Sequence, residues 1–223
     1  MNWKNYWNTN VEEKGSDVFG QVQRKDLRST LLTVNHIVRV LDIKPSDTVL
    51  DVCCGNGIIT QQIAKKCDSI VGVDQSEKLL YVAKRDYKEM NCLYMNCSAL
   101  EMSQLVKLHS FDKIYLQFSF QYFDKRNEGK NVIAEMLKCL KPKGKIFIGD
   151  ITDYKRKHKL YDTPLKKAFY YKQILQSKNG MGKFWKEEEL YNFCKILGVK
   201  GTYLEQANEL PYAHYRFDYL IEN

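Results

Sequence analysis

The sequence contains no apolar stretch that approaches the length of a membrane span. Its first residues, Met-Asn-Trp-Lys-Asn-Tyr-Trp, include no apolar core of a signal peptide. No Cys-x-x-Cys or His-x-x-x-His spacing indicates a zinc site, and the seven cysteines, an odd number, are expected to be reduced thiols. We therefore expect a cytoplasmic protein without a metal site.

Internal repeats and low-complexity segments are also absent. At 223 residues, with 44% apolar and 13% aromatic residues, the chain predicts one globular domain with a substantial core. The formal net charge of +8 is compatible with a nucleic-acid partner, with an anionic small substrate, or with solvated helix faces rich in lysine. Charge alone does not decide among these partners.

The most informative pattern is an apolar run, Val49-Leu-Asp-Val, that breaks into Cys-Cys-Gly-Asn-Gly57. A second apolar run ends at Asp74, nineteen residues after Gly55. Glycine allows a strand to turn sharply into a helix and lets the backbone approach a ligand, and the new helix presents free N–H groups. An acid at the end of the second strand can accept hydrogen bonds from ribose hydroxyls. The two runs predict a βαβ unit that holds a nucleoside.

The third glycine of a dinucleotide fingerprint is missing, because Thr60 occupies that position. This difference argues against a NAD-dependent oxidoreductase, which stays open as an alternative. The remaining pattern, Asp51-x-x-x-Gly55-x-Gly57, resembles the first motif of class I S-adenosylmethionine (SAM)-dependent methyltransferases. The resemblance implies that Asp51 orients the aminoacyl group of SAM and that both glycines, with Cys53 beside them, lie against the cofactor. The product would be S-adenosylhomocysteine.

The resemblance extends over about residues 30–221, through Leu140-Lys-Pro-Lys-Gly144 and the order of the later elements. It implies an α/β, doubly wound, seven-stranded and mostly parallel Rossmann-like sheet, with an antiparallel last strand and helices on both faces. From periodicity and turn signals we expect strands near 48–53, 69–74, 92–95, 111–118, 145–151 and 215–221, and helices near 27–41, 57–67, 76–88 and 127–140.

The single methyltransferase domain is expected to divide into four parts. These are an N-terminal cap or lid (1–26), a SAM-binding core (27–151), a substrate-side insertion (152–183), and a C-terminal helix with strands (184–223). The first and third parts interrupt the regular alternation of elements. Loops on a rigid scaffold often determine specificity, so we expect these parts to cover the cofactor cleft.

Further cofactor contacts follow from the resemblance. Gln75 follows Asp74, Ser98 and Ala99 would lie against the adenine, and Gln117 would lie beside the methionine part of SAM. In the lid, Trp7 gives apolar cover and Arg24 can pair with the carboxylate of SAM. A tail packed on the outside of the sheet is the alternative for this N-terminal segment.

Three residues are candidates for the catalytic step. Tyr122 is expected to face the substrate pocket, and His158 and His214 could reach the mouth of the cleft as general bases. Nothing in the sequence calls for a metal.

The expected function is SAM-dependent methylation of a small molecule. The compact plan resembles small methyltransferases of bacterial surface-polysaccharide clusters, which implies O-methylation of a sugar or phosphate-type group, with an anionic or nucleotide-linked acceptor. An RNA methyltransferase and a SAM-binding protein without catalysis remain alternatives. The oligomeric state stays open.

Overall fold

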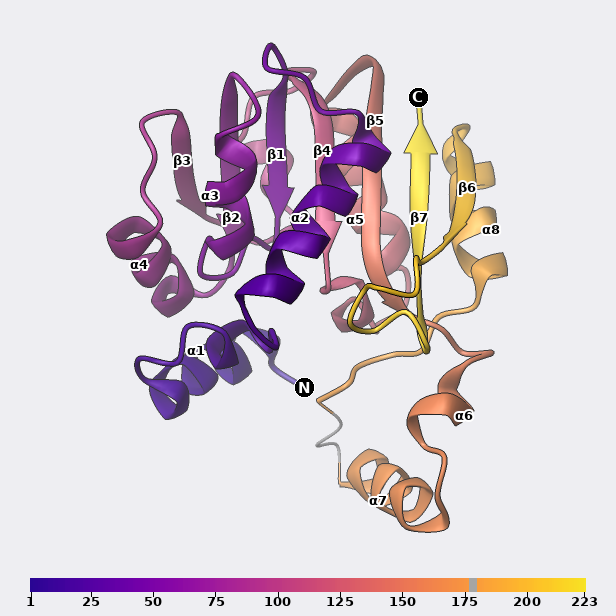
Figure 1. Cartoon of the computed structure of the whole chain (residues 1–223). Coiled ribbons are helices and arrows are strands. Elements are labelled where there is room, and N and C mark those ends of the chain that lie inside the picture. The colour runs from indigo at the N-terminus through magenta and orange to yellow at the C-terminus, as the bar shows by residue number, and fades with distance from the viewer. Residues whose placement is uncertain (177–179) are drawn as a thin grey trace.

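A computed structural model describes residues 1–176 and 180–223 of the chain. Seven strands form one sheet in the order β3-β2-β1-β4-β5-β7-β6 (Figure 1). Strand β7 pairs antiparallel with both β5 and β6, while the other neighbours pair parallel. The strands are β1 (Thr48–Val52), β2 (Ser69–Asp74), β3 (Cys92–Asn96), β4 (Phe111–Gln117), β5 (Leu140–Thr152), β6 (Lys200–Glu205) and β7 (Arg216–Glu222).

Helices lie on both faces of the sheet (Figure 1). They are α1 (Trp3–Lys14), α2 (Leu27–Leu41), α3 (Ile58–Ala64), α4 (Glu77–Asp86), α5 (Glu128–Cys139), α6 (Lys157–Leu160), α7 (Pro164–Leu175) and α8 (Glu187–Leu197). Short 3₁₀ turns, η1 (Gly20–Val22), η2 (Met102–Gln104) and η3 (Phe120–Tyr122), link some of them. The predicted doubly wound fold is confirmed.

Two apolar clusters form the core, one on each face of the sheet. Residues of α2 and α3, such as Ile37 and Ile63, pack in one cluster. Residues of α5 and α8, such as Met136 and Leu190, pack in the other. Because both faces are covered, the parallel strands are nearly continuous apolar runs. The carboxyl ends of β1, β2 and β4 lie at one edge of the sheet, and this packing holds that edge in place.

Local sequence signals explain the helix starts nearest that edge. Ser76 caps α4, since its side chain accepts a hydrogen bond from the backbone N–H of Leu79. Asp26 and Ser29 form a capping box at the start of α2. Both helices begin where the sequence predicts them.

The structure also differs from the expected bounds. Strand β5 begins at Leu140 and not at Lys145, because Leu140 already pairs with Phe111 of β4. Residues 3–14, for which no helix was expected, form α1. In the described residues, no helix is long and apolar enough to cross a membrane. Helices α1, α6 and α7 all lie beyond the carboxyl ends of the parallel strands (Figure 1).

Candidate cofactor site

The turn after β1 has an unusual backbone. Cys53, Gly55 and Gly57 all have positive φ, of 62°, 59° and 81°. At Gly57, which caps α3, a Cβ would lie 2.5 Å from the hydroxyl oxygen of Tyr94. Glycine is therefore required at this position for both dihedral angle and space. The tight turn brings the end of β1 beside the end of β2.

Asp74 ends β2, and its carboxylate is fixed by the backbone. The N–H of Gly55 donates to Oδ2 at 2.9 Å, and the N–H of Ser76 donates to Oδ1 at 2.8 Å. Burial raises the pKa of Asp74 above its usual value, while these hydrogen bonds oppose the shift. Each carboxylate oxygen has a further lone pair, so Asp74 can still accept hydrogen bonds from a ligand.

Asp51, in β1, is held by two side chains. The hydroxyls of Thr60 and Tyr115 each donate to Oδ2 at 2.6 Å. Burial raises the pKa of Asp51 to about 7, because the charged form is poorly solvated there. Both donors bind Oδ2, and Asp51 lines the cavity described next, which leaves Oδ1 to a ligand.

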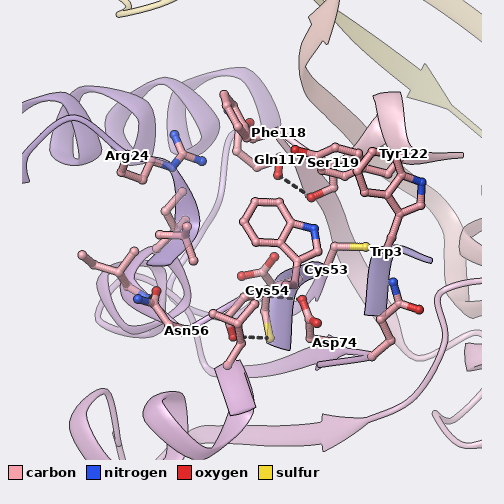
Figure 2. A pocket seen from close by; sticks show the side chains of 18 of the residues that line it. Trp3, Arg24, Cys53, Cys54, Asn56, Asp74, Gln117, Phe118, Ser119 and Tyr122 are labelled. Carbon is pink, nitrogen blue, oxygen red and sulfur yellow. Dashed lines mark hydrogen bonds between the residues drawn. The ribbon is translucent and has the colours of Figure 1, made fainter. Parts of the chain in front are cut away.

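Two adjacent cavities follow this edge of the sheet. The first, of about 110 Å³, is lined by the motif residues and by aromatic side chains. The second, of about 360 Å³, is lined by residues after β3. Both are lined by Cys53, Asp74 and Gln75, so together they form one trough. Figure 2 shows the first cavity, with Arg24, Asn56, Asp74 and Gln117 around it.

The structure brings most of the predicted cofactor residues to this trough. The first cavity is lined by Trp7, Arg24, Asp51, Cys53, Gly55, Asp74, Gln75, Gln117 and Tyr122. The second is lined by Cys53, Asp74, Gln75, Ser98, Ala99 and Tyr122. Gly57 lines neither cavity, since it shapes the turn from behind.

The two histidine candidates lie elsewhere. His158 is exposed in α6, and its Nδ1 lies 3.1 Å from the backbone oxygen of Lys155. His214 is exposed, with its ring against Tyr215 at 4.8 Å. Neither lines either of the two cavities. Without movement of their loops, these imidazoles cannot take a proton from a molecule in the trough.

A buried polar network supports the wall formed by β4 and β5. Asp150 accepts hydrogen bonds from the side-chain amides of Gln117 and Gln206, and its Oδ2 lies 3.8 Å from Nη1 of Arg24. The Oε1 atom of Gln117 is buried and has no partner among the described residues. Since Gln117 lines the first cavity, a turn of its side chain would offer this oxygen to a ligand as an acceptor.

Arg24 is itself tightly enclosed. Its side chain is only 5% exposed, and burial lowers its pKa. The guanidinium carbon lies 5.3 Å from the ring centre of Phe118, which also lines the cavity. A ligand carboxylate would therefore meet an Arg24 that is already positioned by Asp150 and Phe118.

The N-terminal helix α1 covers the trough. Lys4 pairs with Glu77 at 2.8 Å, and Ser76 donates to Oδ1 of Asn8 at 2.7 Å, so α1 is attached to α4. The ring centres of Trp3 and Tyr122 are 4.3 Å apart. Trp3 thereby forms part of the wall of both cavities.

Sequence reasoning did not identify Trp3, Asn56 or Tyr115 as site residues. The spacing of Trp3 and Trp7, one helical turn apart, was the signal for Trp3. Asn56 donates to the backbone oxygen of Val18 at 2.8 Å and so ties the glycine turn to the N-terminal segment. Such contacts depend on tertiary structure and leave no local pattern.

The glycine turn and the two acids lie in a part of the chain that matches a known family model. Residues 49–144 match the family model described as a methyltransferase domain. The sheet order, the two acids and the glycine turn belong to that matched part or adjoin it. Residues 49–144 are therefore similar to a methyltransferase domain, and they lie within a sheet of Rossmann-like strand order.

The particular similarities are more distant. The chain is 27% identical over 151 residues to demethylmenaquinone methyltransferase of Bacillus cereus (strain ATCC 10987 / NRS 248), a match that covers 60% of this chain and 61% of that relative. The chain thus spans about three fifths of the length of such curated relatives.

Solved structures show the same fold. A phosphoethanolamine N-methyltransferase 2 of Haemonchus contortus, in complex with phosphomonomethylethanolamine and S-adenosylhomocysteine, aligns with a TM-score of 0.70 and 15% identity, covering 100% of this chain and 59% of that chain. The DhpI-SAM-HEP complex aligns with a TM-score of 0.65 and 14% identity, covering 98% and 94%. At these sequence identities, the alignments support a shared fold and nothing more.

Proposed function

We propose that the chain is a SAM-dependent methyltransferase that acts on a small molecule. The observation that carries the proposal is Asp74, whose carboxylate is fixed by the N–H groups of Gly55 and Ser76 where the two cavities meet. The methyltransferase-domain match and the names of the relatives support the same activity and the same cofactor.

The residues present fit SAM, because the trough holds polar groups that its protein neighbours do not satisfy. Asp74 would accept hydrogen bonds from the ribose hydroxyls, and Ser98 and Ala99 would border the adenine in the second cavity. In the first cavity, the buried Oε1 of Gln117 would accept a hydrogen bond from the ammonium group of the methionine part. Arg24 would pair with its carboxylate.

When bound, SAM supplies a methyl group that the sulfonium makes electrophilic. The chain's own task is to bind the acceptor, orient it and exclude water. Burial raises the pKa of Tyr122 well above its usual value, so its hydroxyl keeps its proton at neutral pH. We therefore assign Tyr122 a role in positioning the acceptor as a hydrogen-bond donor, and no role as a base.

The walls of the first cavity favour an apolar, ring-shaped acceptor. Five aromatic side chains line this cavity: Trp3, Trp7, Phe118, Tyr122 and Phe123. Flat rings provide apolar contact and favourable offset or edge-on packing for another ring. A quinone of the demethylmenaquinone kind, which the relatives' name specifies, is one acceptor of this class.

The sugar or phosphate-type acceptor expected from the sequence, in polysaccharide biosynthesis, remains a prediction. Of the two buried cations near the cavity, Arg24 is paired with Asp150. Arg216 donates to the backbone oxygen of Asp150, while its Nε has no partner among the described residues. An anionic acceptor would have to compete with those partners. The structure thus favours the apolar acceptor over the anionic one.

The test is a methyl-transfer screen with labelled SAM. Acceptors are short-chain demethylated naphthoquinones, sugars, nucleotide sugars and RNA, each with the wild type and with Trp7→Ala. We expect methyl transfer to the quinone. The KM for the quinone should be higher in Trp7→Ala, because the cavity that binds the quinone ring loses one wall. Methyl transfer only to a sugar would show that the acceptor is a sugar and not a quinone. If SAM binds but no methyl group is transferred, the result would favour a SAM-binding protein without catalysis.

We further propose that residues 1–26 act as a lid. The covering helix α1 is joined to the site by exposed ion pairs and few hydrogen bonds, which are weak enough to break and reform. Trp3 and Trp7 would then leave the trough when SAM enters and return to close it. A Trp fluorescence change on SAM binding that Trp7→Phe diminishes would test this motion.

A further inference from the structure

Helix α7 is unlike the other long helices of the described chain. Of its twelve residues only Tyr170 is buried, and its ring packs at a tilt against Tyr161, with the ring centres 4.4 Å apart. The exposed apolar side chains include Leu165 at 81%, Phe169 at 60% and Leu175 at 86% exposure. Soluble proteins rarely leave several large apolar side chains together in water without a binding partner.

The exposed side chains form one face. In a helix, positions 165, 169 and 175 fall within about a third of a turn of one another, and Tyr170 points to the opposite side. The buried ring of Tyr170 therefore attaches α7 to the molecule, and the apolar face points away from it. In Figure 1, α7 projects beyond the sheet on the same edge as α1.

The surrounding charge is mainly positive. Residues 157–175 contain five lysines and one aspartate, so this short segment carries a net charge of +4 out of +8 for the whole chain. Lys167 and Lys172 make no ion pair with any described residue, although Lys166 pairs with Asp162. Position 172 lies on the apolar face, where a long lysine stem can lie along apolar groups and extend its ammonium outward.

Lys183, which follows α7 in the described part of the chain, adjoins the proposed acceptor cavity. The backbone N–H of Lys183 donates to the backbone oxygen of Gln121 at 2.9 Å, and Gln121 precedes Tyr122 of the cavity wall. An aromatic path also links the two regions, because Phe118 of the cavity lies 5.3 Å from Tyr212, and Tyr212 lies 6.1 Å from Tyr215. Tyr215 belongs to the same apolar cluster as Tyr170 of α7.

We propose that α7 docks this protein on an anionic lipid surface. Leu165, Phe169 and Leu175 enter the boundary between headgroups and acyl chains, and the lysines contact the phosphates. A second copy of this chain fits less well, since a symmetric contact would place two +4 segments against each other. A projecting, convex helix face also matches a soft apolar layer better than a preformed protein groove.

Docking at this place would bring the acceptor cavity to the membrane surface. The docking itself does not rest on the proposed function, because lipid binding is measured without SAM or acceptor. If lipid binding fails, the methyltransferase proposal stands, and the reverse also holds.

The experiment is co-sedimentation of the full chain with vesicles of phosphatidylcholine alone or mixed with phosphatidylglycerol. We expect binding to the mixed vesicles that weakens at high salt. Lys167→Glu/Lys172→Glu should weaken it at least about thirtyfold, since each lysine at an anionic surface contributes about fivefold. Phe169→Ser/Leu175→Ser should weaken it at least about tenfold.

Matched controls lie at the opposite edge of the sheet. Lys66→Glu/Lys107→Glu makes the same charge change, and Met90→Ser/Leu105→Ser removes exposed apolar groups. Both should leave vesicle binding within about twofold, and circular dichroism should show all variants folded. Failure of the wild type to bind anionic vesicles, or equal losses in the controls, would overturn the proposal. A wild-type dimer that Phe169→Ser/Leu175→Ser dissociates would assign the face to a second copy instead.

Discussion

Thr60 donates its hydroxyl hydrogen to Oδ2 of Asp51 across 2.6 Å. Thr60 stands where a dinucleotide-binding motif would have its third glycine, so the residue that argues against NAD also serves the site. The bond opposes the effect of burial on Asp51 and favours its charged form. An ionised Asp51 is the form that can bind the ammonium group of SAM.

Replacing Thr60 by valine removes this bond and keeps the shape. Thr60→Val should raise the pKa of Asp51 further, so that SAM binds about tenfold more weakly at neutral pH and regains affinity in alkaline buffer. Calorimetric titrations over a pH series measure this. Thr30→Val, a buried change in α2 away from the trough, is the control. A loss that is equal at every pH would contradict a role through Asp51.

Stability should depend on pH through Asp51. Its pKa is about 7 in the folded chain against an ordinary value of 3.8, so the folded state holds this proton more tightly than the unfolded state. The wild type should therefore lose stability as pH rises between these values, by up to about 4 kcal/mol relative to Asp51→Asn. Urea unfolding of both proteins at a series of pH values measures the difference. If the stability of both proteins changed in parallel with pH, Asp51 would not titrate in this pH range.

Asp74 should contribute to ligand affinity mainly through its hydrogen bonds to the ribose. Asp74→Asn keeps one oxygen for the N–H donors but loses the charge, and SAM affinity should fall by about 1.5–3 kcal/mol, the contribution of hydrogen bonds to a charged group. S-adenosylhomocysteine, which has the same ribose, should lose the same amount. Melting temperatures separate this effect from unfolding. Undiminished affinity for both ligands would mean that the ribose binds elsewhere.

Arg24 should be needed to bind the carboxylate of SAM. Arg24→Gln removes a charge-assisted pair and should weaken SAM binding about tenfold. Arg28→Gln, an exposed change at the second residue of α2, should have no effect. A ligand without the aminoacyl group, such as methylthioadenosine, should bind wild type and Arg24→Gln equally. If methylthioadenosine also bound Arg24→Gln more weakly, Arg24 would affect binding through the fold and not through the carboxylate.

The βαβ core could be predicted from the sequence because its signals are local. The run before Gly55 is buried strand, the glycines take positive φ, and Asp74 ends the next strand, all within one short segment. The sequence also predicts Ser76 as a cap, since a capping residue and its partner are neighbours. The order of later elements then fixes the sheet.

Helix α1 could not be predicted in the same way. Its sequence, Trp3–Lys14, is largely polar with no continuous apolar face, and its stability comes from contacts with α4 and with Tyr122. The polar network of Asp150 joins residues far apart in the chain, such as Arg24, Gln117 and Gln206. The placement of His158 and His214 away from the trough likewise depends on how the surrounding loops pack.

The most direct test of the account is calorimetry of the purified chain with SAM, S-adenosylhomocysteine and NAD. We expect both SAM and S-adenosylhomocysteine to bind one site per chain, Asp74→Asn to weaken the binding of both, and NAD not to bind. Binding of NAD with no heat from either SAM species would contradict it, since the glycine turn and Asp74 would then hold a dinucleotide.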